Sequence, residues 1–290
     1  MWFWLALGGS IFSSLSIIIN KKALRSINPT VLTWVLFAFP IPFLLVYFVV
    51  QGFPSVGSLF WIGVFCSAFM FVISKTLTME SIKHDDLSKV YPLNSLSSVF
   101  AYFLALLFLS EHITVVALLG LIVSVFGVYI LNAGKRGEGL LEPLKYLVKH
   151  KGSRIIIIAS LLGGATAVTD KMAILGSVTN DPLLPLLAEN SIMVLILFFY
   201  MQKRERDWTD QVKGNWRWLL IAGILYFITN IFVFTSFAGG PVALAIGIKK
   251  LQVLFILVLS LILFKDKPSR YAWLGSVLML IGVLMIKLGG

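Results

Sequence analysis

The chain has 290 residues, of which 59% are hydrophobic and only 13% are charged, and its mean hydropathy is +0.95. Soluble domains carry about 25% charged and about 45–50% apolar residues, so this composition excludes a soluble enzyme and a transcription factor. Its single cysteine, Cys66, excludes an intrachain disulfide scaffold. The composition predicts an all-α, multi-pass integral membrane protein, which we place in a prokaryotic plasma membrane.

Ten apolar runs are long enough to cross a bilayer, whose core of about 30 Å needs roughly 20 residues per helix. In chain order they are residues 2–19, 31–50, 56–77, 87–109, 113–131, 154–175, 182–200, 216–237, 241–264 and 270–287. The short connections leave no room for a soluble domain. We therefore expect one membrane domain that comprises a first five-helix repeat (1–132), a basic connecting loop (133–153) and a second five-helix repeat (154–290).

The positive charges predict the topology. Most of the 24 lysines and arginines lie in loops that follow odd-numbered spans, at positions 21–25, 83, 135–154, 203–217 and 265–270. The other side carries only Lys171 and Lys287. The positive-inside rule places the basic loops in the cytoplasm and both termini outside. The net charge of +11 is thereby explained by topology and by lipid headgroups, so we expect membrane lipids as partners and no nucleic acid.

The two halves of the chain resemble each other in sequence. Residues 109–131 align with residues 264–286, and residues 20–23 align with residues 170–173. The matches include Glu111 with Asp266, Gly120 with Gly275 and Gly127 with Gly282. Because each half has an odd number of spans, the halves must be inverted relative to each other. Inverted repeats are typical of secondary transporters, which bind their solute near the membrane midplane between the halves.

Two segments at matching places in the halves carry a family resemblance. Residues 107–111 read Leu-Phe-Leu-Ser-Glu before a glycine-rich span, and residues 263–266 read Leu-Phe-Lys-Asp before the last span. With the five-plus-five arrangement, the whole chain resembles the EamA-like branch of the drug/metabolite transporter superfamily. The resemblance implies ten transmembrane helices and transport of a small solute, with no enzymatic activity and no cofactor.

Three further segments are similar to the triose-phosphate and nucleotide-sugar translocators of the same superfamily. Residues 19–24 with Asn28-Pro29 look like the end of their first helix, and residues 169–173 look like a segment of their sixth helix. Lys249 and Lys250 lie where those carriers have a cationic pair in the ninth helix. The likeness implies that these cations hold a phosphate.

Lys249 and Lys250 are the ninth and tenth residues of the span 241–264, about 13 Å deep at 1.5 Å per residue. A charged side chain near the bilayer centre costs at least about 2.5–3.5 kcal/mol and marks a candidate functional site. The alternative is a salt bridge that joins this helix to a neighbour. Glu189 in the seventh span, followed by Asn190, is the natural counter-charge. It is also a candidate for proton coupling or for contact with a substrate amine.

The other candidates are weaker. Lys171 either contacts solute or lies at the interface, paired with its neighbour Asp170, and Lys75 is close enough to the cytoplasmic boundary to reach it. The remaining polar candidates within the spans are Asn20, Tyr91, Asn94, Tyr226 and Asn230. Small faces around Gly120 and Gly275 suit close helix contact, either within the fold or in a homodimer. Pro40 and Pro42 predict a kink in the second span.

These observations predict a secondary active transporter of a small organic metabolite that works by alternating access. We expect a central cavity lined by spans one, three, four, six, seven, eight and nine. The excess of deep lysines over Glu189 favours an anionic or phosphorylated solute. A proton-coupled exporter of amino acids or other polar metabolites, a lipid or lipid-precursor flippase and a non-transporting scaffold remain open. The sequence has no ATP-binding loop and no hydrolase or metal-site motif.

Overall fold

The computed structural model describes residues 1–84, 96–133, 151–205, 207–264 and 270–289. Helices make up nearly all of this part of the chain, and an isolated bridge joins Val56 to Ser177. The helices are α1 (Trp2–Ala23), α2 (Pro29–Ala38), α3 (Pro40–Gln51), α4 (Ser58–His84), α6 (Leu96–Phe108), α7 (Val115–Ala133), α9 (Lys151–Leu175), α10 (Leu183–Arg204), α11 (Trp208–Gly214), α12 (Trp216–Gly239), α13 (Val242–Lys249), α14 (Gln252–Phe264) and α15 (Arg270–Gly289).

Eight helical segments of the described chain are long and apolar enough to cross a membrane. They coincide with the predicted spans one to three and six to ten. Shorter apolar helices, Leu96–Phe108 and Val115–Ile130, lie at the positions of the fourth and fifth predicted spans. The prediction of an all-helical, multi-pass membrane protein is confirmed, and eight segments of the described residues are long enough to span.

Two predicted spans are each divided into two helices. The second span breaks at Phe39, directly before Pro40, as the prolines predicted, because proline has no N–H to continue the helical ladder. The ninth span was predicted to be one continuous helix, and the structure shows that this prediction was wrong. It is interrupted at Lys250 and Leu251, where Leu251 N donates to Ile248 O and Val253 N donates to Lys250 O. These bonds reach back three residues instead of four, which tightens the helix locally.

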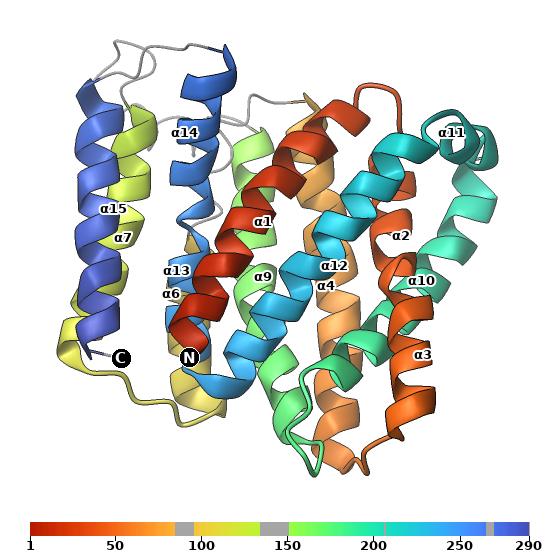
Figure 1. The fold of residues 1–290 in the computed structure, drawn as a ribbon, viewed down its shortest axis with the longest axis horizontal. Coiled ribbons are helices and arrows are strands. Elements are labelled where there is room, and N and C mark those ends of the chain that lie inside the picture. The colour runs from red at the N-terminus through yellow and green to blue at the C-terminus, as the bar shows by residue number, and fades with distance from the viewer. Residues whose placement is uncertain (85–95, 134–150, 206, 265–269, 290) are drawn as a thin grey trace.

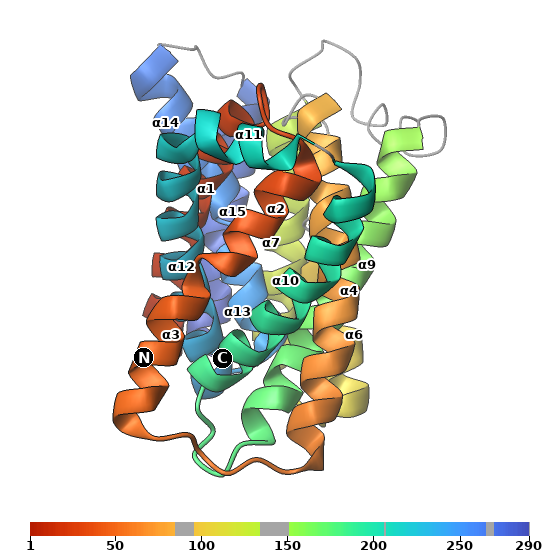
Figure 2. The ribbon, with the colours of Figure 1, turned by 90° about the vertical axis from the view of Figure 1, so that its right-hand side faces the viewer.

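The two termini lie at the same end of the helix bundle (Figure 1). The opposite end holds the last turn of α1, with Lys21 and Lys22, the turn that follows, with Arg25, and also α11 with Lys213 (Figures 1 and 2). The described basic turns therefore share one end, as the charge pattern requires. That this end is cytoplasmic stays a prediction.

Helix packing has the symmetry of two inverted halves. α1 packs along α12, α4 packs along α9, and α7 packs along α15. If the halves are exchanged, α1 takes the place of α9, α4 that of α12 and α7 that of α15. The exchange turns the α1–α12 pair into the α9–α4 pair and leaves the α7–α15 pair as it is. α1 and α9 run in opposite directions through the bundle (Figures 1 and 2).

Glycines allow α7 and α15 to approach closely. A Cβ added to Gly120 would meet the backbone of Gly282, and one added to Gly127 would meet the backbone of Gly275. The small faces that the sequence indicated are thus used within the chain. A homodimer stays a prediction.

Candidate functional site

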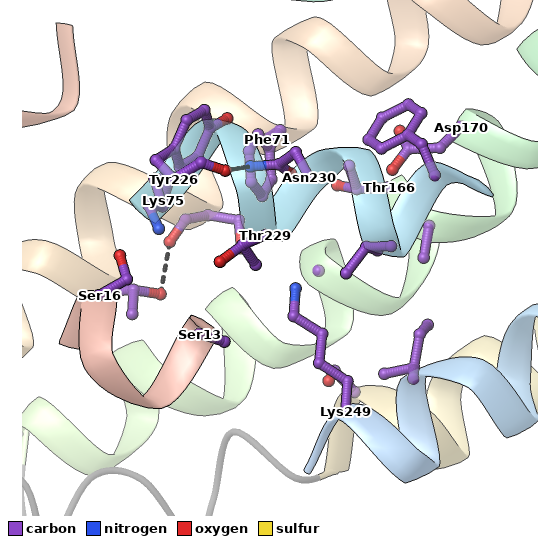
Figure 3. A pocket seen from close by; sticks show the side chains of 18 of the residues that line it. Ser13, Ser16, Phe71, Lys75, Thr166, Asp170, Tyr226, Thr229, Asn230 and Lys249 are labelled. Atoms are coloured by element: carbon purple, nitrogen blue, oxygen red, sulfur yellow. Dashed lines mark hydrogen bonds between the residues drawn. The ribbon is translucent and has the colours of Figure 1, made fainter. Parts of the chain in front are cut away.

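A cavity of about 160 Å³ lies in the centre of the bundle, between the two halves. Side chains from α1, α4, α6, α9, α10, α12 and α13 line it, together with residues at the break after α13. These helices are the seven spans that the sequence predicted around a central cavity. Figure 3 shows part of this wall, with Lys249 reaching from α13 toward Thr229 of α12.

Three lysines share this cavity. Lys249 and Lys250 enter it from the helix break, and Lys75 enters it from α4. Lys249 interacts electrostatically with each of the other two. Lys75 also lies 5.5 Å from the centre of the Tyr226 ring, a cation–π contact. A cluster of lysine side chains in the interior is therefore the main electrostatic feature of the site.

The helix break favours positive charge at this position. Lys249 is the last residue of α13, and the negative end of a helix dipole attracts cations. A break in a membrane helix also leaves backbone carbonyls without their usual partners, and such discontinuous helices form the binding sites of many secondary transporters. The break and the two lysines next to it, Lys249 and Lys250, thus belong to one structural feature.

Two carboxyl groups also line the cavity. They are those of Asp170 of α9 and Glu189 of α10. Ser67 of α4 donates to Asp170 Oδ1. Lys249 lies within electrostatic reach of Asp170. Glu189 Oε1 is buried and has no hydrogen-bond partner among the described residues.

Neutral polar groups complete the wall. Ser13 of α1 donates to Gln252 of α14, which joins the two halves beside the break. Asn20 Nδ2 lies 3.4 Å from Ser16 Oγ, and Asn20 Oδ1 is buried without a partner in the described chain. Asn230 Nδ2 donates to Tyr226 O at 2.8 Å within α12.

The sequence profile of the EamA-like transporter family matches residues 1–133 and 150–288, which are the two halves of the chain. The chain belongs to the EamA-like transporter family. It is therefore a membrane transporter of small solutes, and its family is not one of enzymes. A solved structure titled "Crystal structure of protein" superposes with a TM-score of 0.72 at 12% identity, over 97% of this chain and 95% of the other, which shows the shared fold. A search of curated proteins found no match.

The predicted site residues of this EamA-like transporter fall into three groups. Lys249, Lys250, Glu189, Asn20, Tyr226 and Asn230 line the central cavity. Tyr91 and Asn94 lie outside the described residues. Lys171 and Asn190 do not line the cavity.

Lys171 has a different role from the predicted one, and its partner is not Asp170. Its Nζ lies 2.5 Å from Glu111 Oε1 and donates to Gly240 O at 2.6 Å. Glu111 Oε2 accepts from Val242 N at 2.9 Å. Lys171 and Glu111 therefore hold the start of α13 against α9 and the turn after α6. We call these two residues and Gly240–Val242 the Lys171–Glu111 clamp.

Asn190 is fully buried beside the site, and its Nδ2 donates to Leu186 O at 2.7 Å within α10. The pairing of Glu189 with Lys249 or Lys250 stays a prediction.

Sequence reasoning missed several polar residues of the wall, among them Lys75, Asp170 and Gln252. Lys75 was expected to reach the cytoplasmic boundary, but α4 continues to His84, about two and a half turns further, so Lys75 lies inside the bundle. Asp170 could have been found from the repeat, because it aligns with the candidate Asn20. Gln252 has no such signal, since its place at a helix break appears only in the structure.

Proposed function

We propose that this EamA-like transporter is a secondary active transporter of a small anionic organic solute, phosphorylated compounds included. The observation that carries the proposal is that three lysines and two carboxyl groups of the described chain line one central cavity. Lysines therefore outnumber carboxyl groups among these residues, and a site lined mainly by one sign of charge attracts a solute of the opposite sign. An anionic solute suits this composition.

Alternating access is supported by the arrangement of the site. Its walls come from both inverted halves, and Lys249 and Lys250 lie at the break of a discontinuous helix. Such a break lets the two parts of a helix move separately around a bound solute. We further propose that α6 and α7 cross the membrane with the eight longer segments, which gives ten spans.

The size of the cavity limits the solute. Its volume of about 160 Å³ resembles that of an engineered cavity of about 150 Å³ that holds benzene. We therefore expect a solute of few heavy atoms, such as a three-carbon phosphate or carboxylate.

The test compares molecules that differ mainly in charge. Glycerol 3-phosphate and lactate, with neutral glycerol as the matched control, are added to the purified protein in a thermal-shift assay and to proteoliposomes in a counterflow assay. We expect the two anions to raise the Tm and to exchange, and glycerol to do neither. Lys249→Gln should abolish both effects, whereas Lys213→Gln on the exposed α11 should change neither. The proposal is wrong if the anions act no better than glycerol.

A second candidate follows from the carboxyl pair. Asp170 and Glu189 beside Lys249 offer both charges that an amino acid needs, which favours an exporter of zwitterionic metabolites. Alanine tested beside lactate separates the two functions, because the two molecules share a carboxylate and a similar size. Stronger exchange of alanine than of lactate favours the exporter.

A further inference from the structure

We propose that a groove formed by α4, α6 and α9 on the outer surface of the bundle binds one acyl chain of a membrane phospholipid. The groove has a volume of about 570 Å³, and no described residue lines both it and the central cavity. The proposal goes beyond the transport of a solute and holds whichever solute the central cavity takes.

The groove has a buried floor and exposed rims. α9 packs against both α4 and α6. Val168 of α9 is only 2% exposed, whereas Phe65 and Phe69 of α4 are 49% and 56% exposed and Phe108 of α6 is 65% exposed. The groove is therefore concave and opens away from the bundle, where a membrane transporter meets lipid.

Close helix contacts hold this shape in place. A Cβ added to Gly63 of α4 would meet the backbone of Ala173 of α9, and one added to Gly164 of α9 would meet the backbone of Ser97 of α6. Small residues of this kind let membrane helices approach each other closely. The floor and the two rims thus belong to one tightly packed unit.

The lining of the groove suits hydrocarbon. Among the described residues that line it, none is charged. The Thr169 hydroxyl already donates to Thr166 O at 2.9 Å, and the Cys66 thiol is a weak donor that packs like a small apolar group. The groove therefore has nothing to offer a polar solute or a lipid headgroup, and its occupant is apolar.

The length of the groove fits one leaflet. It runs along α4 from Ile62 to Met70, eight positions or about 12 Å at 1.5 Å per residue. It lies toward the Ser58 end of α4, at the end of the bundle that also holds the termini (Figure 1). Half of a hydrocarbon core of about 30 Å is about 15 Å. An acyl chain of the leaflet at that end therefore matches the groove.

The volume favours a chain over a second copy of the protein. A helix is about 10–12 Å wide with its side chains, so 12 Å of its length occupies at least about 900 Å³. A second copy would therefore cover the groove without filling it. An acyl chain is narrow and flexible enough to enter, and it restores the dispersion contacts that an empty groove lacks.

α9 separates the groove from the central cavity. Its Thr166 and Asp170 line the cavity, whereas its Ala165 and Val168 line the groove. A chain in the groove thus packs against the back of a helix that carries a residue of the central cavity.

Native mass spectrometry of the purified full-length protein, titrated with dioleoyl phosphatidylcholine in detergent, tests the site. We expect the first phospholipid to bind at least about tenfold more tightly than later ones. Ala165→Phe fills the floor of the groove and should remove this difference. Leu161→Phe adds a ring one turn earlier on α9, at an exposed position that does not line the groove, and should keep it.

Chemical modification of the wild type gives a second test that needs no substitution in the groove. Cys66 is the only cysteine of the chain, it is exposed, and it lines the groove. Alkylation with N-phenylmaleimide should abolish the tight binding, and phosphatidylcholine added first should slow alkylation at least about tenfold. Cys66→Ala treated with the same reagent should bind as before.

Several results would overturn the proposal. They are equal affinity for the first and later phospholipids, tight binding that survives in Ala165→Phe or after alkylation, and an alkylation rate that phosphatidylcholine leaves unchanged. A dimer that Ala165→Phe dissociates would assign the groove to a second copy instead. Because these measurements contain no transported solute, failure of the proposed function leaves their outcome unchanged.

Discussion

The Lys171–Glu111 clamp gives the sharpest stability prediction. The two charged groups lie 2.5 Å apart, and their side chains are only 12% and 13% exposed. Glu111 also accepts from Val242 N, and Lys171 donates to Gly240 O, so both ends of the ion pair are anchored to the start of α13. Replacing either residue should therefore weaken the contacts among α9, the turn after α6 and the start of α13.

The expected magnitude lies between two limits. Exposed ion pairs contribute about 0.2–1 kcal/mol, whereas breaking a buried pair costs about 3–5 kcal/mol because one charge is left without compensation. For a nearly buried pair we expect about 3 kcal/mol for Lys171→Met, which leaves the carboxylate unpaired, and about 2 kcal/mol for Glu111→Gln, whose amide still accepts from Val242 N. The double variant should show a coupling of about 2 kcal/mol between the two side chains.

Equilibrium unfolding in detergent micelles measures this double-mutant cycle. Lys213→Met on the exposed α11 is the control, and it should change the free energy of unfolding by less than about 0.5 kcal/mol. A coupling below about 0.5 kcal/mol would show that the pair behaves like a solvated surface contact, and the assigned role as a clamp would then be refuted.

Three further predictions concern the packing and the wall of the cavity. Gly120→Ala should destabilise the protein by about 1–3 kcal/mol in the same unfolding assay, because the added methyl group meets backbone, whereas Gly214→Ala meets open space and should have little effect. Lys75→Gln should weaken binding of glycerol 3-phosphate at least about tenfold in titrations, and unchanged affinity would place Lys75 outside the binding site. Ser13→Ala removes the donor to Gln252 and should lower unfolding stability by about 1 kcal/mol, and a neutral result would show that this contact contributes nothing.

The helical architecture was predictable because hydropathy and charge act on long stretches of sequence. An apolar run of about 20 residues and a set of basic turns each depend on many residues. One atypical residue therefore does not change the prediction. Pro40 identified one break correctly, since the cause is local and chemical. The break at Lys250 has no proline or glycine at the point of interruption, and it could not be found from the sequence.

The site was predictable only in part for a similar reason. Depth within a span identified Lys249, Lys250 and Glu189 as candidates, but it does not give the rotation of a helix or the length by which it extends past the span. Lys75 was misjudged because α4 is longer than its apolar run, and Lys171 because its partner, Glu111, comes from the other half of the chain. Pairings between distant segments depend on the packed structure.

The close packing of α7 and α15 has a consequence for the rate of transport. These two helices give no residue to the cavity within the described chain, yet they touch α13, whose last residue is Lys249. A Cβ on Gly247 of α13 would meet Leu121 of α7 and Ile286 of α15. The pair therefore forms the packing surface behind α13. Changing the bulk of Leu121 or Ile286 should alter turnover while the preference among solutes is kept, so speed and selectivity are set by different parts of the molecule.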